Sequence, residues 1–432
     1  MNKTKSSHIL DVYLEDRLIG ELTELPTGAI EFKYSQKWLN DAHRFPVSYS
    51  LPLTEKLYAG AEVRNFFNNL LPDNEKVKER LAVRVHANSS HDFDLLGAVG
   101  KDCVGAFLFL PHGSPAPKLK SASGTPLTPK KISQILEALP IAPLGNDFEN
   151  DFRISIAGAQ DKCGFLFLND QWNTPIGTTP TSHIFKTTMG MLPNGIDLST
   201  SIENEWLCLR LTRALGLDTA DAKIGVFENQ KCLIVTRFDR KWTKEKKTLH
   251  RLPQEDLCQA LGFSSSKKYE SDGGPGIQAI MNLLMTSDYP QRDRSQFMRA
   301  LLVFFLLGAT DGHAKNFSIF NTQTGFFLTP IYDVISAYPA LHKKQIRQNQ
   351  VRLSMAVGNS RKYKWHEIHR RYWYETAKLC DFPASELDRL IEDLTQKMEN
   401  LLDTGIQLPP GFPKWVYTSI LDGMSTALRR LH

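Results

Sequence analysis

Alternating apolar and polar residues predict a small antiparallel sheet near the start of the chain. Between residues 9 and 34 the apolar side chains recur with a period of two, as in strands that bury one face: they include Leu10, Val12, Leu14, Ile30, Phe32 and Tyr34. A helix is expected over Glu75 to Val83, because Asp73 or Asn74 can cap its first turn. Cys103 to Leu110 is a further apolar run typical of a strand. Residues 1–112 are therefore predicted to form an N-terminal α+β domain.

The next stretch interrupts this pattern. Gly113 to Lys131 is rich in Pro, Ser, Gly and Lys and nearly free of large apolar residues, which is typical of a linker. We therefore place an interdomain linker at residues 113–131.

The remaining chain divides into a mixed part and a helical part. Strand-like runs at 164–168, 183–186 and 232–237, with a helical pattern at 203–215, predict a small sheet-and-helix lobe over 132–238. From residue 239 to 432 the pattern is mostly helical, with predicted helices at 254–261, 277–285 and 293–307. The predicted fold class is α+β, with a β-rich N-terminal domain followed by a small lobe and a mostly α-helical lobe.

Composition places the chain among ordinary globular proteins. Its 432 residues are 41% hydrophobic and 23% charged, which excludes a disordered or fibrous protein and leaves room for two or three domains. The net charge of +5 is too small to imply nucleic acid. No apolar run follows the N-terminal lysines, and Leu301 to Leu307 is too short to span a bilayer. Six scattered cysteines without a CxxC pair suit reduced thiols. We expect a cytoplasmic protein that does not contact membranes.

The candidate chemistry is concentrated in Asp311-Gly-His-Ala-Lys-Asn316 and in Asp333. Phosphoryl transfer of the protein-kinase type needs a carboxylate that accepts the proton of the attacking hydroxyl, then an Asn and a second Asp that hold Mg²⁺ against the ATP phosphates. A predicted hairpin (317–320 and 325–328) would return Asp333 beside Asn316, and the apolar helix 297–307 would mount the loop rigidly. Singly, each residue suits a turn or a helix cap. Together they predict a catalytic site.

A kinase also needs groups that bind phosphates. Lys186 ends a strand as the phosphate-binding lysine of protein kinases does, and either Glu203 or Glu205 can hold it. In residues 153–162 the small side chains of 157–159 would let backbone amides approach phosphates. That stretch has neither a Walker A pattern nor GxGxxG, so its pattern alone is weak.

Three further segments each admit more than one interpretation. Thr187 to Ile202 is a substrate-gating loop or a plain solvent loop, and Ser264 to Gly276 is a lid, a platform for a protein substrate, or a solvent loop. Residues 341–374 contain nine Lys or Arg and one acid. Within them Arg361, Lys362 and Lys364 would either contact DNA phosphates or form a solvated basic face.

Several sequence motifs together resemble the HipA-like serine/threonine kinases, the toxin components of bacterial toxin–antitoxin modules. The resemblance runs from about Ile9 to about Leu401, and no catalytic position is missing. The motifs lie at 50–53, 66–74, 100–106, 155–162, 203–211, 236–240, 254–259, 311–318 and 332–336.

The resemblance implies a fold related to eukaryotic-type and phosphoinositide kinases, with ATP between two lobes. It assigns Asp311 as catalytic base, Asn316 and Asp333 as metal ligands, and Ser155 as an autophosphorylation site that silences the enzyme. A phosphoserine there would carry nearly two negative charges and repel ATP. The further ATP-binding residues that it implies are Ala157, Gly158, Ala159, Gln160, Asp161, Lys162, Lys186, Thr236, Arg237, Phe238, His313, Lys315 and Tyr332.

The resemblance also implies partners. They are a HipB-like, helix-turn-helix antitoxin dimer that binds DNA, operator DNA contacted through the antitoxin complex, and a protein substrate in translation such as an aminoacyl-tRNA synthetase. Two alternatives stay open at this point: a small-molecule kinase of the aminoglycoside or choline type, and a DNA-bound corepressor without catalysis.

Overall fold

The computed structural model describes residues 8–118, 120–139, 162–192 and 195–432. The chain divides into two compact units. The first unit comprises Met1–Thr187, Gly225–Ser266 and Ile319–Thr324. The second comprises Thr188–Ile224, Lys267–Ser318 and Gly325–His432. Each unit is described separately below.

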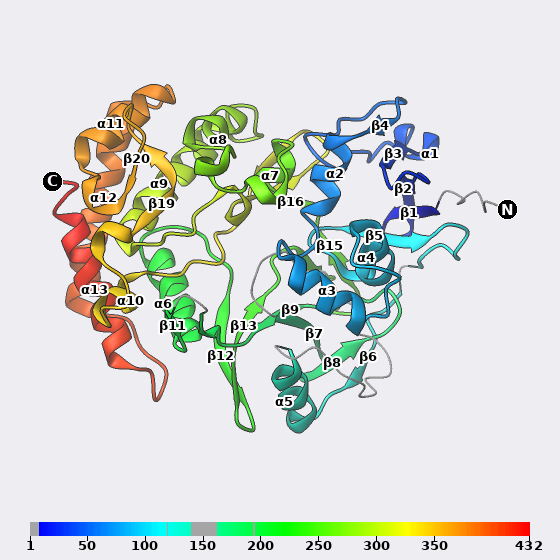
Figure 1. Ribbon diagram of the computed structural model, residues 1–432, viewed down its shortest axis with the longest axis horizontal. Helices are drawn as coiled ribbons and strands as arrows, with labels where there is room; N and C mark the ends of the chain where they lie inside the picture. Colours follow the sequence, from blue (N-terminus) through cyan, green and yellow to red (C-terminus); the bar gives the residue numbers. More distant parts are fainter. Residues whose placement is uncertain (1–7, 119, 140–161, 193–194) are drawn as a thin grey trace. The chain divides into compact units, whose positions relative to one another are not determined.

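The first unit begins with the predicted antiparallel sheet (Figure 1). Its strand order is β4-β3-β2-β1-β5, and β1, β2 and β3 fall where the alternating pattern places them. Helix α3 starts after Asn74, whose side chain accepts hydrogen bonds from the backbone N–H groups of Lys76 and Val77, so the predicted helix and cap are confirmed. The elements are β1 (His8–Leu14), β2 (Arg17–Glu24), β3 (Ile30–Tyr34), α1 (Gln36–Leu39), β4 (Tyr58–Ala59), α2 (Ala61–Asn68), α3 (Glu75–Arg84), α4 (Asp92–Val99) and β5 (Phe107–Pro111).

A second sheet follows, with strand order β12-β13-β9-β7-β8-β6. Helix α5 (Pro129–Ala138) packs on it through Ile132 and Leu136, which share a core with Phe185. The edge strand β6 lies inside the stretch predicted as a linker; an edge position tolerates its Pro126, which cannot donate a ladder hydrogen bond. The strands are β6 (Gly124–Pro126), β7 (Lys162–Leu168), β8 (Gln171–Pro175), β9 (His183–Lys186), β12 (Ala222–Phe227) and β13 (Gln230–Thr236).

The predicted helix at 254–261 is in fact a strand followed by a shorter helix. Residues Gln254–Asp256 form β16, and α7 covers only Leu257–Ala260. Asp256 caps α7: its side chain accepts from the Gln259 backbone N–H, and the Gln259 side chain accepts from the Asp256 N–H. This capping box fixes the helix start at residue 257. Two more short strands, β14 (Arg240–Trp242) and β15 (Leu249–Arg251), pair with each other.

A buried network of charges joins the two sheets within the first unit. Asp102, just before β5, accepts a hydrogen bond of 2.9 Å from the Arg240 guanidinium, and Arg237 binds Asp239 at 2.8 Å. Burial alone would raise the pKa of Asp102, but Arg237 and Arg240 outweigh it and hold that pKa below its usual value. The side chains of Asp102, Arg237 and Arg240 are each 1% exposed, so the network is part of the interior.

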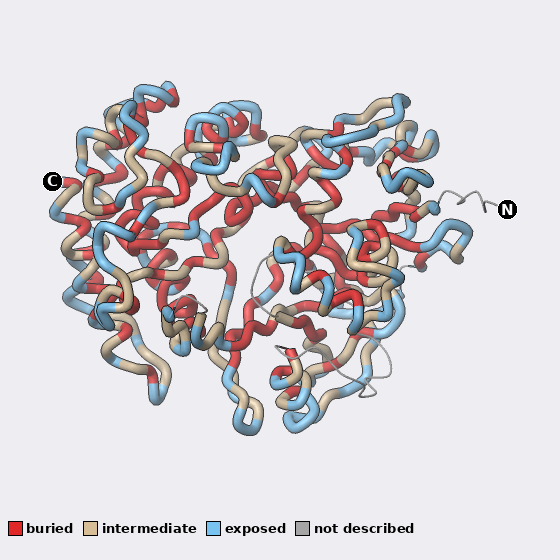
Figure 2. The backbone as a smooth tube through the Cα atoms, in the orientation of Figure 1, coloured by how far each residue is buried: buried red, intermediate tan, exposed pale blue. Residues whose placement is uncertain are grey.

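The second unit is built around α9 (Pro290–Leu307). The helix is apolar on all sides from residue 300 to 307, which predicts burial, and it is buried there (Figure 2). Helices α6, α8, α12 and α13 pack against it. The elements of this unit are β10 (Gly190–Met191), β11 (Asp197–Leu198), α6 (Ser201–Ala214), α8 (Ile277–Leu284), α10 (Tyr338–His342), β19 (Arg352–Val357), β20 (Lys362–Lys364), α11 (Arg370–Leu379), α12 (Ala384–Thr404) and α13 (Lys414–Leu428). Strands β17 (Ser318–Asn321) and β18 (Phe326–Leu328) follow the catalytic segment.

The cysteines are free thiols in the structure, as their scattered spacing in the sequence suggests. All six cysteines lie in described segments, are buried and form no disulfide there. Burial raises the pKa of the Cys103 thiol to about 12 and that of Cys380 to about 11, so these thiols stay protonated. Among the described residues, no helix has both the length and the apolar surface that crossing a bilayer requires.

Candidate active site

The candidate catalytic loop begins where α9 ends. Gly308 has φ +57° and closes the helix in the left-handed conformation; a Cβ there would lie 3.1 Å from the ring of Tyr338. The next residue, Ala309, forms a β-bridge with Ser336, whose hydroxyl donates to the Leu307 carbonyl at 2.6 Å. The loop is therefore held to the helix end from both directions.

Within the loop, the side-chain carboxylate of Asp311 is half exposed, whereas its backbone carbonyl is hydrogen-bonded to buried residues. The Asp311 side chain is 52% exposed. Its backbone carbonyl accepts hydrogen bonds from the Asn316 side-chain nitrogen at 2.6 Å and from the His313 N–H at 2.8 Å. Asn316 and His313 are buried. Because the Asn316 amide nitrogen makes this bond, its Oδ1 oxygen is the atom suited to a metal ion.

Asp333 sits in the left-handed backbone conformation, with φ +58°. Non-glycine residues seldom adopt this conformation, and those that do are often functional. The neighbouring Tyr332 hydroxyl donates to the Lys315 carbonyl at 2.8 Å and lies 2.5 Å from the Ser318 hydroxyl. Since Tyr332 precedes Asp333 and Lys315 precedes Asn316, these bonds tie together the two segments that carry the predicted metal ligands.

Two residues that contact the candidate site were not identified from the sequence. The first is Asn204 of α6, whose amide nitrogen donates to the Ser336 carbonyl at 2.8 Å and whose oxygen accepts from the Ser336 N–H at 3.0 Å. It thereby positions the segment just after Asp333. The sequence feature that could have identified Asn204 is its position between Glu203 and Glu205, which are both buried. Whether one of these glutamates pairs with Lys186 stays a prediction.

The second missed residue is Tyr269, which lies in the segment interpreted only as a lid, platform or loop. Its hydroxyl donates to Asp311 Oδ1 at 2.5 Å, and its ring lies edge-on to His313 with a centroid separation of 4.9 Å. The His313 Nε2 atom is 3.6 Å from the same Oδ1. The 264–276 segment therefore reaches the candidate base.

Two lysines face each other in the first unit. Lys162 of β7 and Lys186 of β9 are direct cross-strand partners, so both project from the same face of the sheet. Lys186 is buried. Ser155 and Ala157 to Asp161, the predicted phosphorylation site and phosphate loop, lie outside the described residues.

Of the predicted ATP-binding residues Thr236, Arg237 and Phe238, Arg237 belongs to the buried charge network. Thr236 pairs with His183 in the sheet, and the Arg237 N–H donates to the Ser182 carbonyl at 3.0 Å. The Arg237 guanidinium is committed to acidic side chains, and the Phe238 ring lies 5.9 Å from that of Phe320. The Arg237 carbonyl also accepts from the Arg240 N–H at 3.3 Å, so its backbone groups are engaged as well. The assignment of Arg237 to ATP stays a prediction.

The candidate DNA-contacting residues all have acidic neighbours. Arg361 pairs with Glu270 at 3.1 Å, and Lys362 and Lys364 pair with Glu367 at 3.2 and 3.5 Å. These partners favour the solvated basic face; direct DNA contact stays a prediction.

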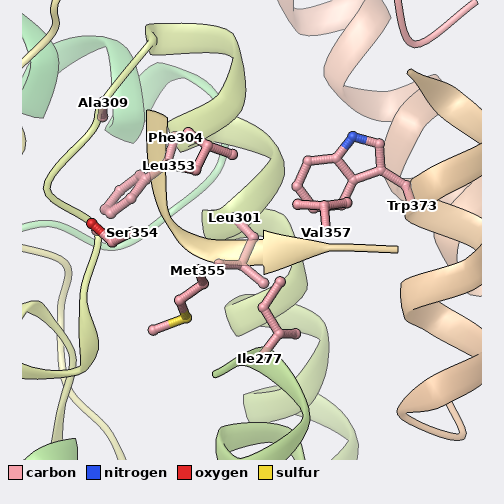
Figure 3. Close-up of a pocket in the computed structure, with 10 residues that line it drawn as sticks. Ile277, Leu301, Phe304, Ala309, Leu353, Ser354, Met355, Val357 and Trp373 are labelled. Atoms are coloured by element: carbon pink, nitrogen blue, oxygen red, sulfur yellow. The ribbon is translucent and has the colours of Figure 1, made fainter. Parts of the chain in front are cut away.

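A small cavity lies behind the catalytic loop (Figure 3). Its volume is about 20 Å³, and Phe304 and Leu301 of α9, Met355 of β19 and Trp373 of α11 line it. Such a volume holds about one water molecule, so it is not a substrate site. Gly312 also borders it, and a Cβ at Gly312 would lie 2.4 Å from the Phe304 ring, which explains a glycine next to Asp311.

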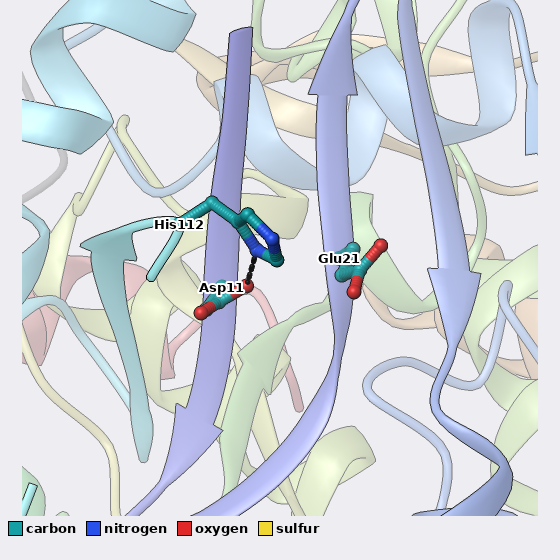
Figure 4. A group of neighbouring side chains, drawn as sticks. All are labelled: Asp11, Glu21 and His112. Carbon is teal, nitrogen blue, oxygen red and sulfur yellow. Dashed lines mark hydrogen bonds and ion pairs between the residues drawn. The ribbon is translucent and has the colours of Figure 1, made fainter. Parts of the chain in front are cut away.

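One potential metal-binding group lies elsewhere in the described chain. Asp11, Glu21 and His112 gather on the N-terminal sheet, with His112 Nδ1 2.8 Å from the Asp11 carboxylate (Figure 4). The hydrogen bond with Asp11 raises the pKa of His112 and so favours the protonated ring, which cannot bind a metal. An ion pair accounts for this group.

Comparison with known proteins identifies the family. Residues 154–402 match the HipA-like C-terminal domain, and residues 10–110 match the HipA N-terminal domain. The chain belongs to the HipA family. Among similar proteins, "Putative kinase Y4mE" of Sinorhizobium fredii is 34% identical over 354 residues, which cover 81% of this chain and 82% of that protein. The serine/threonine-protein kinase toxin HipA of Shewanella oneidensis is 27% identical over 405 residues, covering 91% and 87%.

A solved structure shares the fold. It is the Shewanella oneidensis MR-1 complex of HipA, HipB and operator DNA, matched with a TM-score of 0.78 and 25% identity over 98% of this chain and 96% of that chain. The predicted family and the α+β, kinase-like fold are confirmed. This HipA-family protein is an enzyme, a kinase.

Proposed function

We propose that this HipA-family chain is an ATP- and Mg²⁺-dependent protein serine/threonine kinase that inhibits growth as a toxin. The proposal depends on the different surroundings of the two ends of Asp311. Its backbone carbonyl is bound by Asn316 and His313, whereas its side-chain carboxylate is half exposed. A carboxylate placed in this way can accept the proton of a serine or threonine hydroxyl. We also propose that the protein acts in the cytoplasm, where its six buried thiols would stay reduced.

The donor set fits Mg²⁺ and ATP. Asn316 Oδ1 and the Asp333 carboxylate are oxygen ligands of the kind Mg²⁺ takes in kinases. Lys162 and Lys186 present two cations on one sheet face for phosphates. When bound, the metal and nucleotide supply the electrophilic γ-phosphorus and neutralise its charge. Asp311 would orient the acceptor hydroxyl and accept its proton. Asn316 and His313 hold the backbone of the loop through the Asp311 carbonyl.

The comparisons support the proposed acceptors and partners. The Shewanella relative is named a serine/threonine-protein kinase toxin, which favours a protein acceptor; we propose a component of translation such as an aminoacyl-tRNA synthetase. The related structure contains HipB and operator DNA, which supports a HipB-like antitoxin and co-repression here. Autophosphorylation at Ser155 would inactivate the enzyme.

A transfer assay with radiolabelled ATP tests the proposal. Asp311→Asn keeps the size of the side chain but removes the proton acceptor, so transfer should fall by about a hundredfold or more, while ATP binding and the melting temperature stay unchanged. Growth inhibition on overexpression should disappear, and Ser155 should be unphosphorylated in the variant. Undiminished transfer or toxicity in stably expressed Asp311→Asn protein would contradict the proposal. Asp422→Asn, at an exposed position of α13, is the matched control.

A further inference from the structure

The Tyr269 hydroxyl already makes the contact that an acceptor hydroxyl must make. Phosphoryl transfer requires the substrate hydroxyl to donate a hydrogen bond to the base, at about 2.6–3.2 Å between heavy atoms. Tyr269 donates to Asp311 Oδ1 at 2.5 Å. While that bond is intact, a protein hydroxyl cannot take the same place on that oxygen.

The contact is structurally supported. The Tyr269 ring packs edge-on against the buried His313, at an interplanar angle of 83°. Its backbone carbonyl accepts from the N–H groups of Asp272 and Gly274 at 3.1 and 3.0 Å, so the turn around it is closed. The turn and the ring contact therefore support the position of Tyr269 beside the base.

The residue next to Tyr269, Glu270, anchors the segment through two contacts of its carboxylate. The Glu270 carboxylate accepts from the Ala356 N–H of β19 at 2.5 Å and pairs with Arg361 at 3.1 Å. The Arg361 side chain is 62% exposed, so a bound protein can reach and displace it. Loosening this pair would remove one of the two contacts that hold Glu270, the residue next to Tyr269.

A tyrosine at a base can either orient the carboxylate or occupy it. Asn316 and His313 hold only the backbone carbonyl of Asp311, whereas the Tyr269 hydroxyl bonds to Oδ1 of the half-exposed carboxylate, where an acceptor hydroxyl would bind. The kinetic comparison of Tyr269→Phe with wild type separates the two roles.

We propose that Tyr269 occupies the acceptor position on Asp311 and is displaced by the protein substrate. This rests on the proposed kinase function. Tyr269 is then a specificity-determining residue: an acceptor must displace the Tyr269 hydroxyl to reach Oδ1, whereas a small hydroxyl compound or water that cannot do so finds that oxygen occupied.

The test compares Tyr269→Phe with wild type in the full-length protein. The readouts are ADP release without acceptor, phosphorylation of dephosphorylated casein at varied concentration, and ATP binding by calorimetry. Loss of the hydroxyl removes one hydrogen bond to a charged group, so ADP release should rise, and the KM for casein fall, by about tenfold. ATP affinity should not change. Arg361→Gln should shift both values in the same direction, by less. Tyr289→Phe, a half-exposed tyrosine before α9, is the matched control and should match wild type.

The outcomes separate this inference from the proposed function. If wild type transfers phosphate in an Asp311-dependent way but Tyr269→Phe behaves identically, only the inference fails. A lower kcat with unchanged KM in Tyr269→Phe would make Tyr269 a positioning residue and overturn the inference. Phosphate found on Tyr269 by mass spectrometry would overturn it too, because the residue would be an acceptor itself. If neither wild type nor Tyr269→Phe transfers phosphate to casein, to itself or to water, both the proposed function and the inference fail.

Discussion

At the scale of single residues, burial changes the chemistry of a carboxylate as much as its neighbours do. Glu255 of β16 is fully buried in the first unit and accepts hydrogen bonds from Ser48, the Tyr49 N–H at 2.8 Å and Asn321 at 3.0 Å. Burial raises the pKa of Glu255 to about 7, although these three bonds act in the opposite direction. It is therefore a carboxyl group that titrates near neutrality, outside the catalytic loop.

This raised pKa predicts a pH-dependent stability. Between the ordinary pKa of 4.5 and about 7, the folded protein binds a proton at Glu255 that the unfolded chain does not, so the contribution to stability is full below pH 4.5 and is lost as the pH rises through about 7. Glu255→Gln, which mimics the neutral form, should be more stable than wild type at pH 8 by about 1–3 kcal/mol and equal to it near pH 5.

Urea unfolding at the two pH values measures this difference. The matched control is Glu245→Gln in an exposed loop, which should change neither value. Equal stability of Glu255→Gln and wild type at pH 8 would mean that Glu255 ionises in the folded protein without cost.

At the scale of secondary-structure elements, the active segment depends on a contact between α6 and the chain after Asp333. Asn204 satisfies both the N–H and the carbonyl of Ser336, and both residues are buried. A buried backbone group left without a partner costs more than the bond itself contributes.

Asn204→Ala should therefore destabilise the protein by about 2–4 kcal/mol. It should also reduce phosphate transfer at temperatures where the variant is folded, because the Asp333 segment loses its anchor. Denaturation curves and the transfer assay measure the two effects. Asn400→Ala, exposed on α12, should leave both unchanged, and wild-type stability in Asn204→Ala would exclude the anchoring role.

The distance along the sequence decides what could be predicted at this scale. Asp311, Asn316 and Asp333 lie close together in the chain, and the spacing of residue types indicates their chemistry. The bonds of Tyr269 to Asp311 and of Asn204 to Ser336 join residues 42 and 132 positions apart, and no local pattern reports them. The strand β16 was mistaken for part of a helix because it is only three residues long, Gln254–Asp256, and runs directly into α7. Only the capping box marks the boundary.

At the scale of the whole molecule, the family motif Thr236 to Arg240 has a structural task. Its two arginines bind Asp102 beside β5 and Asp239, and thereby join the N-terminal sheet to the second sheet of the first unit. Breaking a buried ion pair by removing one partner is expensive because the other charge stays buried.

Asp102→Ala should accordingly cost about 3–5 kcal/mol of unfolding free energy. The comparison is Asp221→Ala, which removes a surface pair with Arg213 of similar length, 2.7 Å, and should cost about 1 kcal/mol or less. Urea denaturation of both variants measures the two losses of unfolding free energy. Similar destabilisation by both substitutions would show that the interior network contributes no more than a surface pair.

The basic face allows a quantitative statement about DNA. Arg361, Lys362 and Lys364 lie beside the carboxylates of Glu270 and Glu367, so three cations and two anions leave a net charge of +1. Removing one bound phosphate from a protein–DNA interface lowers the slope of log affinity against log salt by about 0.9. If the antitoxin complex touches operator DNA here, replacing all three residues by Ala should reduce the slope by about 0.9, the value for a single phosphate. Titrations at several salt concentrations, with the antitoxin alone as reference, measure it. A reduction corresponding to three phosphates would mean that DNA displaces both glutamates, and an unchanged slope would leave a solvated basic face.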